Sequence, residues 1–316
     1  MTLAEFYEKA VATGISNDPR GKDAVDKELA SVRKTFGELK DKDREFFDEE
    51  RLRNPYSDTR ILHGRGDEEI ETILAGIDIE VGEVLLADRL RSRGRTVSML
   101  LSHHPEGRAY AHLYDVMRMQ SDVLHRFGVP INIAEDLMEG RIKEVERRLM
   151  PVNHTRAVDA ARLLDIPFMC LHTPADNMVA TYLQRLFDEK KPYRIEDVIE
   201  LLLDIPEYRS ARKIGAGPKV LIGSEKRKAG KVFVDMTGGT EGAKNIFGSL
   251  TAGGVSTIVA MHLSEDHRKE AEKNHLNVVI AGHIASDNVG VNLLLDSILD
   301  DSVEVIECSG FRRVRR

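Results

Sequence analysis

The chain has 316 residues, of which 41% are hydrophobic, and this composition excludes a wholly disordered protein and predicts about two domains. The net charge of −7, with acids and bases interspersed, argues against a nucleic-acid-binding protein, because such a protein presents a basic surface. The chain has only two cysteines and no apolar run near the roughly 18 residues of a membrane span, so we expect a cytoplasmic protein without membrane contact.

Residues 1–58 are predicted to form an N-terminal helical segment. Apolar residues recur at Val25, Leu29, Val32 and Phe36, in the pattern of an amphipathic helix. A break over residues 54–58, which contains Asn-Pro and Ser-Asp, marks the boundary of this segment. From residue 59 onward, short apolar runs alternate with helical stretches.

Residues 59–210 are predicted to form a first α/β lobe. Its candidate strands are 59–62, 73–79, 96–101 and 166–171. Its candidate helices are 82–93, 109–127, 134–148, 154–164, 178–187 and 195–203. A polar, glycine-rich stretch over residues 211–218 is predicted to be a hinge that ends this part of the lobe.

A second, smaller α/β lobe is predicted over residues 218–275, and residues 276–316 are expected to return and complete the first lobe. The strand-like runs of this region are 219–222, 231–235, 256–261 and 278–281. Strands alternating with helices predict two α/β lobes with largely parallel sheets and a ligand cleft between them. The basic run 311–316 is expected to be an exposed tail, with a phosphate contact as the alternative.

Histidines follow four of the predicted strands. His103 and His104 follow one apolar run, and His172, His262 and His283 each follow another. In open α/β sheets, ligands bind outside the carboxyl ends of the strands, because loops and helix N-termini converge there. We therefore expect these imidazoles to gather at one edge of the fold.

Two of these histidines precede an aspartate by four residues, namely His172 before Asp176 and His283 before Asp287. Residues four apart share one face of a helix, so each pair would converge on one point. Each motif alone also fits a weak helical ion pair or an aspartate N-cap, and an isolated His-His pair is more often a surface feature. Together, at matching strand ends, they favour a metal site.

Mixed imidazole and carboxylate ligands suit Zn, Mn, Fe or Co without selecting among them. The donors outnumber those that one tetrahedral ion needs, which predicts two divalent transition-metal ions with a carboxylate free to bridge them. The predicted ligands are His103, His104, Asp176, His283 and Asp287. His172 could be a ligand, a support for the ligands, or a catalytic group that carries protons.

Three blocks of the sequence resemble the signature blocks of the Nif-three-like family, the dinuclear-metal proteins described as GTP cyclohydrolase I type 2 homologues. The blocks are Leu101–Pro105, Leu171–Asp176 and Ala281–Asp287, and the resemblance spans residues 60–299. It implies that the five predicted ligands hold metal and that His172 acts beside them rather than as a ligand. It also implies a homo-oligomer, commonly a hexamer.

The chain departs from that family's pattern at four places, one of which is the N-terminal opening, not recognisable in residues 1–58. Asp287 stands where the family usually has a bridging glutamate. Pro174 and Ala175 replace the middle of the usual His-Thr-Asn-Leu-Asp block. The stretch over residues 119–165 is longer than expected, which implies inserted helices near the site.

A second candidate site is the glycine-rich loop over residues 235–244. Gly238, Gly239 and Thr240 could form a backbone nest for the phosphate of a nucleotide at a helix N-terminus. The loop lacks the Walker spacing, and a tight turn with positive φ is the alternative that the sequence favours.

Other residues have weaker signals. Asp78, near the end of a predicted strand, could orient a ligand imidazole. His262 and His267 could reach the cleft or be structural, and Cys170 is expected to be an inert core residue. The remaining helical histidines are expected to be structural; they are His112, His125, His154 and His275.

These features predict a metal-dependent hydrolase that acts on a small molecule, such as a nucleotide. The alternative is a non-enzymatic metal-binding scaffold or regulatory protein, in which protein ligands close the coordination. A metal-free carbohydrate- or nucleotide-binding protein ranks last, because it would require all five ligand candidates to be coincidental.

Overall fold

The computed structural model describes residues 1–316 and contains two sheets. The first sheet has five strands in the spatial order β1 (Arg60–His63), β4 (Phe168–Cys170), β3 (Met99–Ser102), β2 (Thr72–Gly76) and β9 (Glu304–Cys308). β1 is antiparallel to β4, and the other neighbours are parallel. Every residue of β2, β3 and β4 is buried, as expected for parallel strands covered on both faces.

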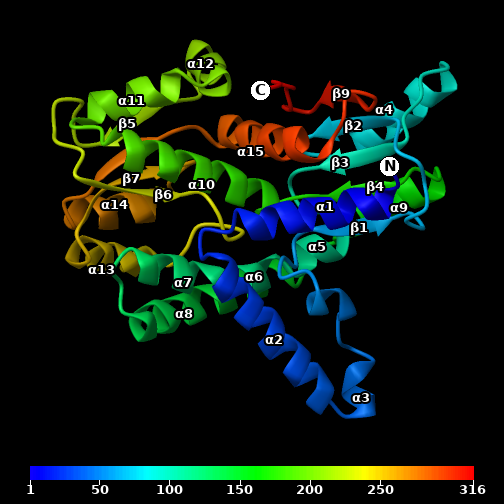
Figure 1. Ribbon diagram of the computed structural model, residues 1–316, viewed down its shortest axis with the longest axis horizontal. Coiled ribbons are helices and arrows are strands. Elements are labelled where there is room, and N and C mark those ends of the chain that lie inside the picture. The colour runs from blue at the N-terminus through cyan, green and yellow to red at the C-terminus, as the bar shows by residue number, and fades with distance from the viewer.

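The second sheet repeats this arrangement with four strands, in the order β5 (Lys219–Ile222), β8 (Asn277–Ile280), β7 (Val255–Ala260) and β6 (Lys231–Asp235). β5 is antiparallel to β8, whereas β8, β7 and β6 are parallel. The predicted fold class, two α/β lobes with largely parallel sheets, is confirmed (Figure 1).

The helices of the chain are α1 (Leu3–Ser16), α2 (Lys22–Glu38), α3 (Asp41–Arg44), η1 (Glu49–Leu52), α4 (Val81–Ser92), α5 (Gly107–Ala111), α6 (Leu113–Val116), α7 (Met119–Arg126), α8 (Ile131–Leu149), α9 (Arg156–Leu163), α10 (Thr173–Lys190), α11 (Ile195–Leu203), α12 (Pro206–Lys213), η2 (Lys244–Ile246), α13 (Phe247–Ala252), α14 (Glu265–Lys273) and α15 (His283–Ile298). None of them has both the length and the apolar character that crossing a bilayer requires.

Two central helices, α10 and α15, connect the lobes. α10 follows β4 of the first sheet, yet its Val179 and Leu183 are in an apolar core with the second sheet. α15 follows β8 of the second sheet, yet its Leu294 and Leu295 are in a core with the first sheet. The two helices pack on each other and so link the cores of the two lobes (Figure 1).

The predicted helix over residues 109–127 is wrong as a single element, because the structure has three short helices there, α5, α6 and α7. The chain leaves helical geometry at His112, whose φ is −105° and ψ is 12°. The carbonyl of His112 accepts a hydrogen bond from the Ser57 hydroxyl at 2.8 Å, a contact with the N-terminal segment that no local pattern reveals.

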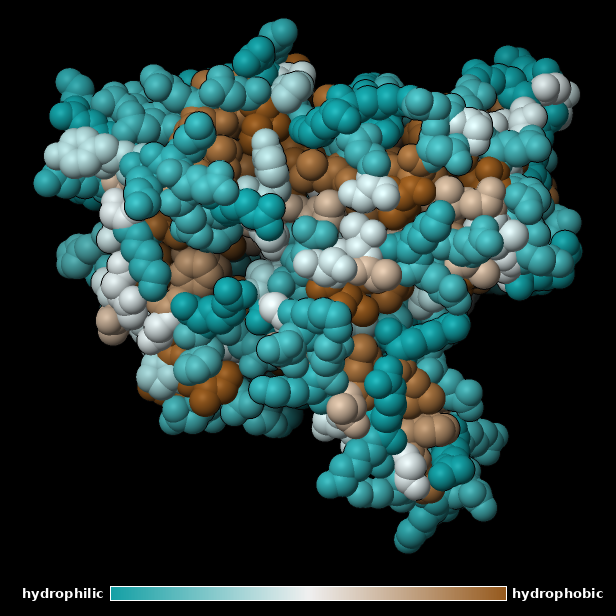
Figure 2. Space-filling model, in the orientation of Figure 1, coloured by the Kyte–Doolittle hydropathy of each residue, from teal (hydrophilic) through white to brown (hydrophobic).

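The N-terminal segment has two parts. In α1, Leu3, Phe6 and Ala10 are fully buried against the first lobe. Residues 22–53, called the projecting arm below, extend from the body (Figure 1). Apolar side chains gather along this arm (Figure 2), and Phe46 is 85% exposed.

The C-terminal region contributes α15 to the core of the first lobe and joins its sheet only with β9. The expected boundary at residue 276 falls just before β8, which pairs with the second sheet. The expectation of an exposed basic tail holds for Arg312, Arg315 and Arg316, which are exposed, but not for Phe311, which is fully buried, or for Arg313, which pairs with Asp296. Arg316 lies 2.7 Å from Glu207, so this end of the chain packs on α12 and α15 through apolar burial and ion pairs.

Candidate metal centre

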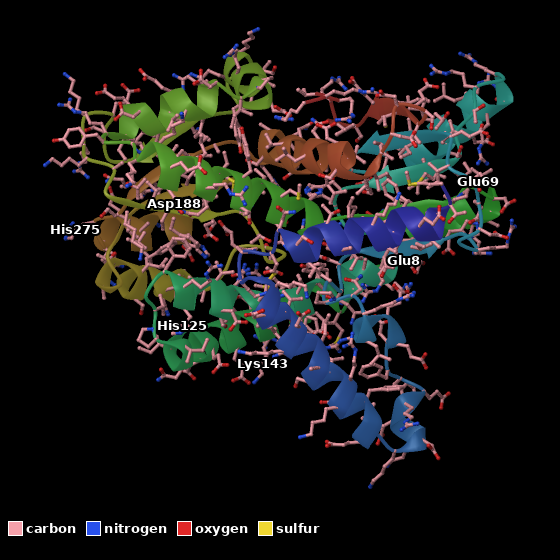
Figure 3. All side chains as sticks on the ribbon, in the orientation of Figure 1. Glu8, Glu69, His125, Lys143, Asp188 and His275 are labelled. Atoms are coloured by element: carbon pink, nitrogen blue, oxygen red, sulfur yellow. The ribbon has the colours of Figure 1, made fainter.

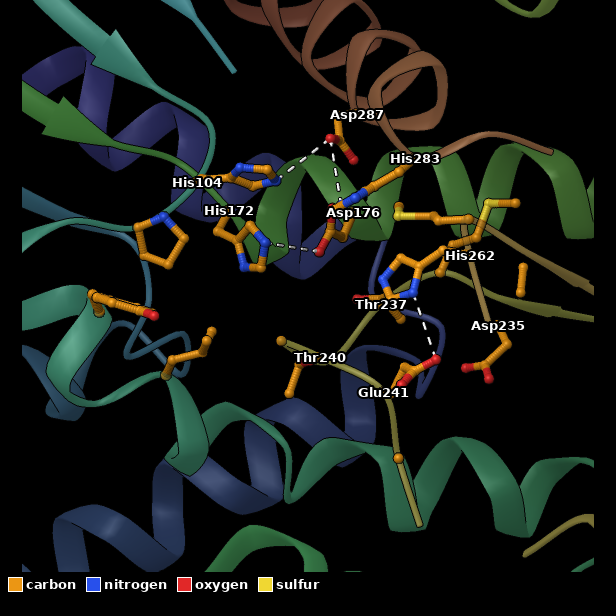
Figure 4. A pocket seen from close by; sticks show the side chains of 18 of the residues that line it. His104, His172, Asp176, Asp235, Thr237, Thr240, Glu241, His262, His283 and Asp287 are labelled. Carbon is orange, nitrogen blue, oxygen red and sulfur yellow. Dashed lines mark ion pairs between the residues drawn. The ribbon is translucent and has the colours of Figure 1, made fainter. Parts of the chain in front are cut away.

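The structure brings the five predicted ligands and His172 together. His103 and His104 follow β3, His172 is the N-cap of α10, and Asp176 lies in the first turn of α10. His283 begins α15 and Asp287 follows one turn later. Because α10 and α15 pack on each other beside the end of β3, the side chains converge (Figure 4).

Asp287 is at the centre of this cluster. Its Oδ1 lies 3.5 Å from His103 Nε2, and its Oδ2 lies 3.5 Å from His104 Nε2 and 3.7 Å from His283 Nε2. Asp176 Oδ1 is also 3.5 Å from His103 Nε2. Two donors bound to one tetrahedral ion at about 2.0–2.1 Å are roughly 3.3 Å apart, so these separations suit donors that share a cation.

The ligand atoms form two sets that have Asp287 in common. One set is His103, Asp176 and Asp287, and the other is His104, His283 and Asp287, with the atoms of each set within 4.8 Å of one another. A third set contains His103, His104 and His172. A carboxylate shared by two sets, with one oxygen toward each, is the arrangement that a bridged pair of ions requires.

Buried polar atoms without partners provide an independent test of the fit. His103 Nε2, Asp176 Oδ1 and both carboxylate oxygens of Asp287 are buried and make no hydrogen bond. Asp287 is only 1% exposed. Buried polar groups are normally paired, and an unpaired buried carboxylate is costly, so these atoms fit metal ligation.

Hydrogen bonds orient two of the imidazoles. His103 Nδ1 donates to the Leu171 carbonyl at 3.0 Å, and His104 Nδ1 donates to Asp78 Oδ1 at 2.7 Å. With each Nδ1 engaged, the free Nε2 faces the cluster, as in metal sites where a carbonyl or carboxylate fixes the ring. The predicted contact of Asp78 with an imidazole of the cluster is confirmed.

His172 is held by a residue that the sequence analysis missed. Its Nδ1 lies 2.8 Å from Asp58 Oδ2, and Asp58 also accepts a 2.5 Å hydrogen bond from Thr173 Oγ1. Burial would raise the pKa of Asp58, but the contacts with His172, Thr173 and Arg60 together outweigh burial and lower the pKa. His172 Nε2 then faces Asp176 Oδ2 at 3.7 Å.

The protein environment shifts the pKa values of the two buried carboxyls in opposite directions. Burial, together with the nearby charge of Asp287, raises the pKa of Asp176 well above its ordinary range. Burial also opposes ionisation of Asp287, but His103 and His104 lower its pKa nonetheless.

The two outer imidazoles differ in the same way. Burial would lower the pKa of His104, but its contacts with Asp287 and Asp78 raise it to about 10. Burial lowers the pKa of His283 to about 4. A cation at the cluster would compete with the protons on Asp176 and His104, since metal ligands bind in their deprotonated forms.

The cluster opens into a cavity of about 410 Å³ between the two lobes. The first lobe contributes Asp78, Glu106 and most of the cluster residues, and the second lobe contributes residues 235–237, 239–242 and 260–263. No lysine or arginine lines this cavity. Sequence reasoning missed Glu106, Asp235 and Glu241, because nothing local distinguishes them from other acidic residues.

Across the cavity from the first lobe lies His262, whose ring centroid is 4.9 Å from that of His283 (Figure 4). Ser102 and Ala260 occupy matching positions in the two sheets, opposite Gly76 and Asp235 respectively. His104 and His262, each two residues further on, therefore have matching places. Of the two roles that the sequence left open for His262, a place in the cleft or a structural role, the structure shows the first.

Each of these two imidazoles faces a carboxylate through Nδ1. For His262 the partner is Glu241 Oε1 at 3.5 Å. Burial would raise the pKa of Glu241, but His262 and the Ser264 amide lower it to about 2. Glu241 in turn raises the pKa of His262. His267 also lines the cavity, but its ring nitrogens bond to Ser264 Oγ and the Gly242 carbonyl, which is a structural role.

The glycine-rich loop packs against the inserted helices. Gly238 and Gly239 have φ of +93° and +88°, so the favoured reading as a tight turn with positive φ is confirmed. Gln120 Nε2 donates to the carbonyls of Gly238 and Thr240 at 2.6 and 2.8 Å. Gly239 and Thr240 line the cavity, whereas Gly238 faces Gln120.

Histidines predicted to be structural lie away from the cluster. His125 and His275 are exposed on the outside of the molecule (Figure 3). Cys170 is buried in β4, and burial raises the pKa of its thiol to about 12, so its prediction as an inert core residue is confirmed.

No protein-family model matches the chain. No curated protein matches its sequence. Among solved structures, a NIF3 superfamily protein from Sphaerobacter thermophilus is 27% identical, with a TM-score of 0.70 over 80% of this chain and 91% of that one. Reduced HcgD from Methanocaldococcus jannaschii is 18% identical, with a TM-score of 0.45 over 89% of this chain and 96% of that one.

A Bacillus cereus protein related to NIF3 is 12% identical, with a TM-score of 0.41 over 79% of this chain and 89% of that one. The Sphaerobacter protein carries the assignment, because its likeness extends over most of both chains in sequence and in fold. The likeness agrees with the three sequence blocks that converge in the structure. The chain therefore belongs to the NIF3 superfamily.

Proposed function

We propose that this protein is a dinuclear-metal hydrolase that acts on a small molecule. The observation that carries the proposal is Asp287, whose two oxygens face different imidazoles beside a cavity of about 410 Å³. Two divalent ions held there would lower the pKa of a bound water toward neutrality and polarise an oxygen or nitrogen of the substrate.

The proposed ligands divide between the two ions. His103 and Asp176 would hold one ion, His104 and His283 the other, and Asp287 would bridge them. The donor chemistry fits Zn, Mn, Fe or Co. Asp78 and the Leu171 carbonyl would keep the imidazoles in register while substrate binds.

His172 is the proposed catalytic proton carrier. Its Nε2 faces the cluster and its ring lines the cavity, so a proton at this atom is within reach of a substrate. Asp58 holds the ring through Nδ1 and so fixes the direction in which Nε2 points. Asp58 is therefore a positioning residue.

A nucleotide is one candidate substrate, with Gly239 and Thr240 in the cavity wall as its proposed contacts. Assembly into a homo-oligomer such as a hexamer follows from the family resemblance alone and stays a proposal. A cytoplasmic location is also proposed, supported by two free, buried cysteines, which suit a reducing compartment.

The alternative is a non-enzymatic metal-binding scaffold or regulatory protein. The burial of His103 and Asp287, at 2% and 1% exposed, favours it, because structural metal sites are closed by protein ligands. The cavity beside His104 and His283 favours the enzyme, because it leaves space for an exchangeable water and a substrate.

Elemental analysis of the purified protein tests the proposal, with a His103→Ala/His104→Ala double variant and an exposed-histidine control, His125→Ala. We expect about two equivalents of Zn, Mn, Fe or Co per chain in the wild type and the control, and loss in the double variant. A wild-type protein that binds no metal, and whose melting temperature no added metal raises, would remove the basis of the hydrolase proposal.

A further inference from the structure

The cavity beside the metal centre has an acidic wall. Its lining includes seven carboxylates and, as noted, neither lysine nor arginine: the acids are Asp78, Glu80, Glu106, Asp176, Asp235, Glu241 and Asp287. Two divalent ions would offset at most four of these negative charges. A metal-loaded cavity therefore remains electronegative when its carboxyls are ionised.

Most of these carboxylates have partners. Asp176 and Asp287 face the proposed ions, while Asp78 and Glu241 face His104 and His262. These contacts provide partners for the four acids nearest the imidazoles. The other three acids lie further along the cavity wall.

Two partly buried acids that line the cavity have no partner in the chain. Glu106 is at the N-cap of α5 but caps no backbone amide, and its carboxylate makes neither a hydrogen bond nor an ion pair. Asp235 ends β6 in the other lobe, and its carboxylate is equally unpaired. Carboxylates left without partners in a concave site are complementary to a ligand that brings donors or positive charge.

Building on the proposed hydrolase function, we propose that the substrate is a small organic cation, an amine, amidine or guanidine. Its reactive bond would lie at the His–Asp cluster and its cationic group against Glu106 or Asp235. Amidinium and guanidinium groups present planar donors that match a carboxylate. A phosphate on the substrate would face like charge along the same wall and find no lysine or arginine there, which disfavours the nucleotide among the candidate substrates.

Titration calorimetry on the metal-loaded full-length protein tests the inference with three probes of one shape, benzamidine, benzamide and benzoate. The three probes are a cation, a neutral molecule and an anion of similar size with the same ring. Differences between their affinities therefore report the effect of charge. We expect benzamidine to bind most tightly. A Glu106→Gln/Asp235→Asn double variant should weaken benzamidine about tenfold, as expected for two partly screened charge contacts, and change benzamide little.

Glu189→Gln removes an exposed glutamate of α10 outside the cavity and should leave all three affinities unchanged. The two single variants and the metal content of each protein identify a variant that has lost its fold. Benzoate binding as tightly as benzamidine, or an unchanged preference in a correctly metal-loaded double variant, overturns the inference. A wild-type protein that binds no metal would contradict the hydrolase proposal instead. The order of affinities for the three probes, measured on that protein, would still test the preference for a cation.

Discussion

The carboxylates behind the imidazoles control the geometry of the metal centre. Asp58 and Asp78 lie in loops before and after the first strands, and each bonds to the Nδ1 of an imidazole in the cluster. Neither touches the proposed ions, so each acts by holding a ring in one tautomer and one orientation. A variant that lacks one of these carboxylates therefore tests the orientation of an imidazole while all the proposed metal ligands remain.

We predict that Asp78→Ala weakens metal affinity by about 10- to 100-fold without abolishing binding, because His104 keeps its donor atom but loses its support. Competition with a chromogenic chelator measures this affinity. Asp188→Ala, which changes an exposed carboxylate on α10 (Figure 3), is the matched control and should bind metal like the wild type. Equal affinities of the two variants would show that Asp78 has no orienting role.

Single residues show where sequence reasoning succeeds and where it stops. His103 and His104 were predictable because they end an apolar strand, and Asp176 and Asp287 because they are four residues from a histidine. Asp58 was not, because it lies 114 residues from His172 in the chain and its segment looked like a domain boundary. Contacts between distant segments leave no periodic signal.

At the level of elements, the crossing of α10 and α15 places both aspartates. A Cβ on Gly290 would lie 2.3 Å from the carbonyl oxygen of Ala175, so the helices approach as closely as a glycine permits. Ala175 precedes Asp176 and Gly290 follows Asp287 by one turn. The departure from the family pattern at Ala175 thus lies in this helix contact, next to the proposed ligands.

Gly290→Ala should lower the free energy of unfolding by roughly 1–3 kcal/mol, because a backbone carbonyl cannot move aside as a flexible side chain would. It should also lower metal affinity by displacing the aspartates. Gly140→Ala in α8, where nothing lies within 4 Å, is the control and should gain about 1 kcal/mol from helix propensity. Urea denaturation measures the free energy of unfolding of both variants. A neutral effect at Gly290 would mean that the crossing is loosely packed.

The elements also correct an apparent repeat. The two four-residue His–Asp spacings suggest equivalent motifs, but His172 precedes α10 whereas His283 is the first residue of α15. Relative to the start of its helix, the second His–Asp pair therefore lies one residue later than the first. His104 and His262, which have no common spacing to an acid, are the pair that strand register makes equivalent. Register depends on strand pairing, which the sequence alone does not reveal.

At the scale of the whole molecule, ion pairs join the projecting arm to the body. Arg60, at the start of β1, is 1% exposed and lies 2.7 Å from Asp48 and 3.5 Å from Glu50, both at the base of the projecting arm. Burial would raise the pKa of Asp48, but Arg60 outweighs it and the pKa is lowered. A carboxyl with a lowered folded-state pKa stabilises the fold above its unfolded pKa and loses that contribution in acid.

Asp48→Asn should therefore destabilise the protein at pH 7 by roughly 1–2 kcal/mol, because Arg60 is left partly uncompensated. The difference from wild type should persist down to about pH 4, the ordinary range of the carboxyl, and disappear at lower pH as Asp48 is protonated. Denaturation curves recorded from pH 7 to pH 3 measure it. A difference that does not depend on pH would contradict the ion-pair account.

The sequence predicted the fold class of the chain, but not how its helices and strands connect the two lobes. Alternating apolar runs and helical stretches predicted two α/β lobes. They did not reveal the exchange of α10 and α15 between the sheets or the late return of β9, because both depend on long-range packing. The exchange places ligands from both lobes around one point.

Anomalous diffraction from crystals of the metal-loaded protein tests the central claim, a metal pair bridged by Asp287, most directly. The account predicts two peaks about 3.5–4 Å apart, one beside His103 and Asp176 and the other beside His104 and His283. A single peak, or two peaks without the Asp287 carboxylate between them, would contradict it.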